Sequence, residues 1–110
     1  MKQGEIWNMY LNPVKGSEQG GNRPAVIISG NMLNKYLEVV IVCPLTTKIK
    51  NYKGNVILNP SNKNGLTDIS EVLTFHVRSV SKVRLRSKIG QVSLEELNAI
   101  KATLNDILRF

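Results

Sequence analysis

The chain has 110 residues and carries 15 lysine and arginine residues against eight aspartate and glutamate residues, a net charge of +7. This length predicts a single domain, residues 1–110, and the 42% hydrophobic content excludes a disordered chain. A single cysteine excludes an intrachain disulfide, the longest apolar run is too short to cross a bilayer, and no signal-peptide hydrophobic region follows Met1. We therefore expect a soluble cytoplasmic protein.

The positive charge is concentrated in the first 92 residues, which hold 13 basic and five acidic side chains and a net charge of +8. Residues 93–110 have a net charge of −1. A basic body attracts polyanions over long range, which makes nucleic acid a candidate partner. Charge that serves solubility alone is the alternative.

Short apolar segments separated by glycine, proline and asparagine predict a small β-rich domain. In chain order, the predicted strands are residues 5–11, 25–29, 38–45, 55–58, 72–77 and 83–85. A short helical turn is expected from Asn31, and NPSNKNG, residues 59–65, is typical of an exposed loop. The spacing of these strands favours a small antiparallel barrel or sandwich.

The C-terminal segment predicts a helix. Ser93 followed by Glu96 is a capping-box pattern, in which each residue binds the other's backbone amide. The apolar residues that follow fall on one helical stripe: Leu97, Ile100, Leu104, Ile107 and Leu108. We expect this helix to close the core of the barrel.

The segment GSEQGGNRP, residues 16–24, lies between the first two predicted strands. A plain surface turn needs glycine and little else, because glycine adopts positive backbone dihedrals without steric cost. Here Glu18 and Arg23 flank a flexible Gly20-Gly21 step, so the loop can present both charges to a partner. It is the first candidate binding site.

Most metal and acid–base mechanisms lack the residues that they need. His76 is the only histidine, which excludes a two-histidine ribonuclease mechanism within one chain and any histidine-rich metal site. Asp68 and Glu71 are a sparse carboxylate pair, better suited to capping or turns than to metal binding. The glycine-rich segment lacks the Lys-Ser/Thr of a phosphate-binding loop. We expect no metal and no cofactor.

RNA cleavage fits such a residue set, because the substrate carries its own nucleophile, the 2′-OH. A protein must align this group with the adjacent phosphate, neutralise developing charge and assist two proton transfers. Arg23 can bind phosphate with its fork of donors, and the segment CPLTTKIK, residues 43–50, offers Thr46, Thr47, Lys48 and Lys50 beside it. A solvated strand end remains the alternative for the two threonines.

Four segments together resemble the MazF/PemK family of toxin endoribonucleases, the mRNA interferases: GEIW, GSEQGGNRP followed by AVIIS, VCPLTT and FHVRSVSKVRL. The resemblance runs from about Gly4 to the end of the chain. It implies a mainly β fold with a C-terminal helix, a small SH3-like or CcdB-like β-barrel that is usually assembled as a homodimer. It also implies metal-independent, sequence-specific cleavage of single-stranded RNA, restrained by an acidic MazE-like antitoxin in a type II toxin–antitoxin system.

The resemblance also assigns roles to individual residues. Arg23 and Thr46 match the family's principal catalytic pair, and Glu18 is a candidate general base, with an ion pair to Arg23 as its alternative role. The positions expected to bind RNA are Ser17, Gln19, Gly20, Gly21, Thr47, Lys48, His76 and Arg78. Arg78 begins a segment in which Ser81 replaces the family's acid, so that segment supplies no carboxylate base.

Two other functions fit the same fold. A CcdB-like toxin would inhibit gyrase and cleave nothing. A C-terminal Trp-Gly-Ile motif would indicate such a toxin, but this chain ends in ILRF. A non-catalytic nucleic-acid-binding barrel would use the basic face without needing Arg23 and Thr46.

Overall fold

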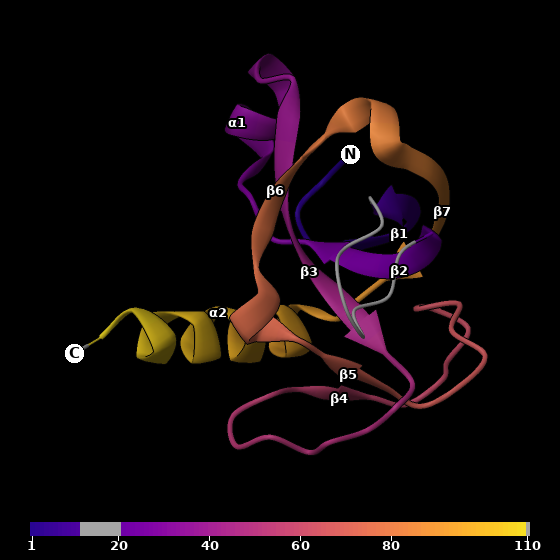
Figure 1. The fold of residues 1–110 in the computed structure, drawn as a ribbon, viewed down its shortest axis with the longest axis vertical. Coiled ribbons are helices and arrows are strands. Elements are labelled where there is room, and N and C mark those ends of the chain that lie inside the picture. The colour runs from indigo at the N-terminus through magenta and orange to yellow at the C-terminus, as the bar shows by residue number, and fades with distance from the viewer. Residues whose placement is uncertain (12–20, 110) are drawn as a thin grey trace.

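The computed structural model describes residues 1–11 and 21–109, which form a curled antiparallel sheet flanked by helices (Figure 1). The strands within these residues are β1 (Glu5–Leu11), β2 (Gly21–Ile27), β3 (Val39–Thr46), β4 (Ile57–Leu58), β5 (Ser70–Val72), β6 (Arg78–Ser81) and β7 (Leu85–Gln91). The helices are α1 (Asn31–Tyr36) and α2 (Leu94–Leu108), with 3₁₀ turns η1 (Thr74–His76) and η2 (Lys82–Arg84). A mainly β fold with a C-terminal helix is confirmed.

Strand β3 organises the sheet, whose order is β4-β5-β3-β2-β1-β7 with β6 also paired to β3. The first half of β3 pairs with β6, from Val39 opposite Ser81 onward. Its second half pairs with β2 on one side, and its last residues pair with β5 on the other. The end of β3 therefore brings the start of β2 and the start of β5 to one place.

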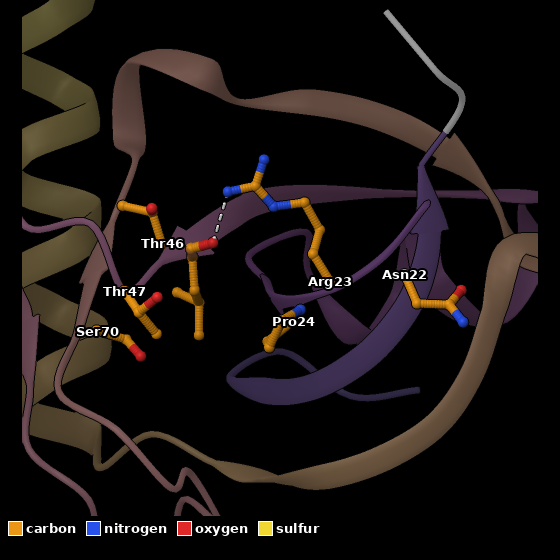
Figure 2. A pocket seen from close by; sticks show the side chains of 7 residues that line it. Asn22, Arg23, Pro24, Thr46, Thr47 and Ser70 are labelled. Atoms are coloured by element: carbon orange, nitrogen blue, oxygen red, sulfur yellow. Dashed lines mark hydrogen bonds between the residues drawn. The ribbon is translucent and has the colours of Figure 1, made fainter. Parts of the chain in front are cut away.

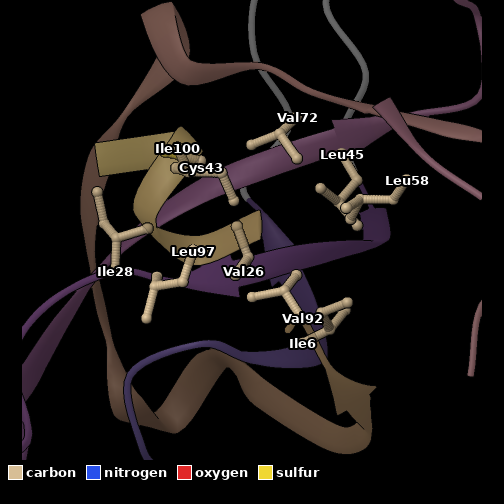
Figure 3. Close-up of a cluster of buried hydrophobic side chains, with 10 residues drawn as sticks. All are labelled: Ile6, Val26, Ile28, Cys43, Leu45, Leu58, Val72, Val92, Leu97 and Ile100. Carbon is tan, nitrogen blue, oxygen red and sulfur yellow. The ribbon is translucent and has the colours of Figure 1, made fainter. Parts of the chain in front are cut away.

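Two apolar clusters pack on opposite faces of the sheet, which explains the nearly continuous apolar run of β3. Successive strand residues point to opposite faces, so Val26 and Cys43 lie in one cluster and Ala25 and Val42 in the other. Helix α2 covers the first face with two buried residues, Leu97 and Ile100 (Figure 3). The helix closes part of the core, as expected.

The capping box of α2 is confirmed. The Ser93 Oγ accepts a hydrogen bond from the Glu96 amide at 3.0 Å, and Glu96 Oε1 accepts one from the Ser93 amide at 2.8 Å. The predicted apolar stripe is buried only in its first half, because the helix extends beyond the sheet (Figure 1) and leaves Leu108 76% exposed. None of the helices in the described part of the chain is long and apolar enough to span a membrane.

The strands predicted at residues 72–77 and 83–85 are wrong in part. The Leu73 amide donates to Pro44 O at 2.8 Å, and the chain then turns, with the His76 amide donating to Leu73 O at 3.0 Å. Further on, Ser81 Oγ accepts from the Val83 amide and caps η2. Such local hydrogen bonds compete with strand pairing, which is why β-prone residues form 3₁₀ turns here.

Candidate active site

A pocket of about 220 Å³ opens where the start of β2 meets the end of β3. Its lining consists of Asn22, Arg23, Pro24, Leu45, Thr46, Thr47 and Ser70. Arg23 and Thr46 are far apart in the sequence, yet they share this pocket because β2 and β3 run antiparallel. Figure 2 shows the Arg23 side chain extending toward the end of β3, with Thr46, Thr47 and Ser70 on that side.

Arg23 is half-buried and its side chain is held by the neighbouring strand β3. Its Nη2 donates a hydrogen bond to the Leu45 carbonyl oxygen at 2.8 Å, the dashed line in Figure 2. Its Nε is buried and has no hydrogen-bond partner among the described residues. Burial also lowers the pKa of Arg23 from its ordinary value. A buried donor without a partner costs about 1–3 kcal/mol.

Thr46 presents a hydroxyl whose oxygen is already fixed. Its Oγ1 accepts a hydrogen bond from the Lys48 amide at 3.1 Å. A hydroxyl can both donate and accept, so this bond leaves the Thr46 proton available for an oxygen in the pocket. Thr47 lies beside it in the lining and is exposed. The pocket thus combines a cation with hydroxyl donors.

Ser70 and Asn22 line the pocket although the sequence did not indicate them. Ser70 is 3% exposed, and its Oγ donates to the Asp68 carbonyl oxygen at 3.0 Å. It follows a turn-rich segment, and only the pairing of β5 with β3 brings it close to Thr46. Asn22 is adjacent to Arg23, and that position is the one signal that points to it.

The remaining predicted RNA-binding residues lie at different distances from this pocket. Lys48 is exposed and directly follows Thr47. His76, exposed on η1, and Arg78, on β6, lie outside the pocket lining. Gly21 begins β2 with φ of 77°, a left-handed conformation that favours glycine. The predictions for Ser17, Glu18, Gln19 and Gly20 fall outside the described residues.

The acidic and cysteine side chains of the described residues are not arranged for metal binding or for thiol chemistry. Within residues 1–11 and 21–109, no three His, Cys, Asp or Glu side chains are grouped closely enough to hold a metal ion. Cys43 is buried, as predicted, and burial raises the pKa of its thiol to about 12, so it stays protonated. Glu71, expected in a cap or a turn, lies buried on strand β5 and accepts hydrogen bonds from three backbone amides of the segment after β3.

Comparisons with known proteins show the family and the fold to which this chain is similar. The protein-family model of the PemK-like, MazF-like toxin of type II toxin–antitoxin systems matches residues 2–108. The endoribonuclease toxin MazF of Escherichia coli (strain K12) is 36% identical over 104 residues, covering 94% of this chain and 88% of that protein.

Two crystal structures from Deinococcus radiodurans have the same fold. One is MazF, with a TM-score of 0.82 at 28% identity over 98% of this chain and 96% of that chain. The other is MazE–MazF, with a TM-score of 0.79 at 27% identity over 98% and 95%. The fold predicted from the resemblance is confirmed. The chain therefore belongs to the family of PemK-like, MazF-like toxins of type II toxin–antitoxin systems.

Proposed function

We propose that this chain is a metal-independent, sequence-specific endoribonuclease that cleaves single-stranded RNA, mRNA included, as the toxin of a type II toxin–antitoxin system. The observation that carries the proposal is the pocket in which the partly paired guanidinium of Arg23 and the hydroxyl of Thr46 come together. Family membership supports it. Because the proposed substrate is mRNA, we expect the protein to act in the cytoplasm.

Cleavage follows from seating one RNA phosphate in this pocket. The 2′-oxygen attacks phosphorus, a new P–O2′ bond forms, and the P–O5′ bond breaks. The 2′-OH loses its proton and the leaving 5′-oxygen gains one, giving a 2′,3′-cyclic phosphate and a 5′-OH. Negative charge grows on the phosphoryl oxygens as the bonds change, so donors from Arg23 and Thr46 bind more strongly in the transition state than in the ground state.

Arg23 serves as an acid and a cation in this scheme, and Glu18 serves as the base. An arginine is a poor base, because its ordinary pKa lies at about 12.5 or above. Burial lowers the pKa of Arg23, which favours donation of a proton to the leaving 5′-oxygen. Glu18 precedes Arg23 closely in the sequence, and it accepts the 2′-OH proton in our proposal.

RNA beyond the scissile phosphate contacts the other predicted positions. These are Ser17, Gln19, Gly20, Gly21, Thr47, Lys48, His76 and Arg78. The lysine and arginine side chains bind phosphates and contribute through release of counterions. A gyrase inhibitor or a non-catalytic barrel would not require Arg23 and Thr46 to share a pocket, and no comparison favours either function.

We expect the purified protein to cut a long single-stranded RNA in the presence of EDTA and to leave single-stranded DNA of the same sequence intact. The reason is that the proposed reaction uses the 2′-OH and protein donors in place of a metal-bound water. Cleavage is followed on denaturing gels, with the Arg23→Ala variant, purified in parallel, as the control for contaminating ribonuclease. Loss of cutting in EDTA and its return with magnesium would overturn this chemistry.

We also expect a homodimer whose RNA groove binds an acidic antitoxin segment in competition with RNA. Apolar side chains that a second copy would cover are exposed on adjacent elements, with Phe75 79% and Leu108 76% exposed on η1 and α2. Two copies joined by a two-fold axis extend one basic groove. An acidic, disordered segment is attracted to it as RNA is and can fold along it.

Light scattering tests the dimer, which should have twice the 12.3 kDa mass of one chain. Titration of the antitoxin segment into labelled RNA complex tests the competition. A single-chain mass at micromolar concentration, or saturable binding of both ligands in one groove, would contradict this arrangement.

A further inference from the structure

The Glu71 carboxylate is completely buried and binds four donors from one loop. It accepts hydrogen bonds from the backbone amides of Lys50, Asn51 and Tyr52 at 2.7, 2.9 and 3.0 Å, and from Asn55 Nδ2 at 2.9 Å. Each carboxylate oxygen receives two of these bonds. A single side chain therefore anchors the middle of the loop between β3 and β4.

This arrangement keeps Glu71 ionised. Burial alone would raise the pKa of Glu71, but the hydrogen bonds outweigh burial and lower the pKa from its ordinary value. Three successive amides converge on the carboxylate, and Asn51, with φ of 55°, adopts the left-handed conformation that such a concave backbone uses. All four donors are neutral, so three backbone amides and the Asn55 side chain stabilise the charge without a cation.

The same residue is tied to the pocket through its strand. Glu71 lies opposite Thr46 in the pairing of β3 with β5, and its neighbour Ser70 lines the pocket. At the start of the loop, the Lys48 amide binds Thr46 Oγ1. Thr46 therefore holds the start of the loop and Glu71 holds its middle. Near its other end the loop is tied to helix α2, where the Thr103 hydroxyl donates to the Gly54 carbonyl oxygen.

The anchored loop carries the chemistry that single-stranded RNA binds. Lys48 and Lys50 are exposed and basic, and Tyr52 is 60% exposed. Basic side chains contact the phosphate backbone, and aromatic rings stack with bases. A disordered loop would have to be ordered by the RNA, which would cost binding free energy.

We propose that Glu71 is a positioning residue that fixes the loop beside Thr46, so that Lys48, Lys50 and Tyr52 hold the RNA strand next to the scissile phosphate. The proposal rests on the proposed function. Glu71 itself touches no RNA and acts through the loop. Its loss should therefore weaken RNA binding and relax the choice of cleavage site, while the chemical step at Arg23 is retained.

The test compares Glu71→Gln with Asp68→Asn on a short RNA that contains one cleavage site. The glutamine amide nitrogen cannot accept the loop's hydrogen bonds, so we expect KM to rise about tenfold while kcat changes by less than about twofold. Asp68 is exposed, and its carboxylate accepts a hydrogen bond from the hydroxyl of the neighbouring Thr67 at 3.2 Å. Asp68→Asn removes the same charge and should leave KM unchanged or slightly lower.

Charge and positioning make opposite predictions for Glu71→Gln. Removing a negative charge from an RNA-binding protein would lower KM, whereas releasing the loop would raise it. Asn55→Ala, which deletes one of the four donors and leaves Glu71 in place, should raise KM by about threefold. It also carries the test if Glu71→Gln fails to fold.

Hydrogen exchange gives a readout without RNA: the amides of residues 50–52 should be protected in the wild-type protein and lose protection in Glu71→Gln. Unprotected wild-type amides, equal KM values for Glu71→Gln and Asp68→Asn, or a fall in kcat at constant KM would overturn the role of Glu71. Failure of the wild-type protein to cleave any RNA would instead overturn the proposed function.

Discussion

Arg23→Ala should lower kcat by on the order of a hundredfold or more, because the arginine contacts tighten as charge develops on the phosphate. The structure supplies the physical basis. One guanidinium nitrogen is fixed to the Leu45 carbonyl, and Nε is buried without a partner among the described residues, so the group is held in place and incompletely solvated before RNA arrives. RNA binding should weaken far less than turnover.

Three further variants separate the roles in the pocket. Arg23→Lys keeps a charge but loses the planar fork of donors, so it should recover only part of the lost rate. Thr46→Val keeps the shape and removes the hydroxyl, and we expect kcat to fall by about tenfold to a hundredfold. Arg86→Ala removes an arginine on β7, outside the pocket lining, and serves as the matched control with unchanged kcat.

Single-turnover rates on RNA at saturating protein provide the measurement, since they report the chemical step apart from binding and product release. Full activity in Arg23→Ala would contradict the assignment. A higher KM at constant kcat would show that Arg23 binds the ground state and the transition state equally well.

Local signals in the sequence predicted much of the fold. The bounds of β1 agree with the prediction, residues 5–11, because Gly4 and Pro13 frame a segment rich in apolar and aromatic residues. The start of α2 also agrees with the prediction, because two residues close in the sequence, Ser93 and Glu96, form its capping box. Arg23 and Thr46 were predicted from the resemblance, and the structure places both in one pocket.

Local sequence patterns could not predict the features that depend on pairing between distant segments. Ser70 enters the pocket only because β5 pairs with β3, and no motif around it signals that partner. Glu71 looked like a sparse metal ligand or a turn residue, and its four loop donors lie 16 to 21 positions away in the chain. The 3₁₀ turn at Thr74–His76 replaced a predicted strand because the His76 amide bonds the Leu73 carbonyl three residues back, a local bond that the apolar pattern does not reveal.

A single 2′-deoxy substitution at the nucleotide before the cleaved bond should abolish cutting at that site. The proposed reaction has no other nucleophile, because the attacking oxygen belongs to the RNA and the protein contributes donors, charge and proton transfer. Binding should change little, since phosphates and bases are intact.

The comparison requires two RNAs of the same sequence that differ only at this 2′ position. The all-ribose strand should yield a 2′,3′-cyclic phosphate and a 5′-OH, identified by mass spectrometry, while the deoxy strand stays whole and competes with the all-ribose strand for the protein with similar affinity. A deoxy substitution at a distant position serves as the control and should leave cleavage intact. Cutting of the deoxy strand at the same bond would require a water nucleophile, and the pocket of Arg23 and Thr46 would then need a different mechanism.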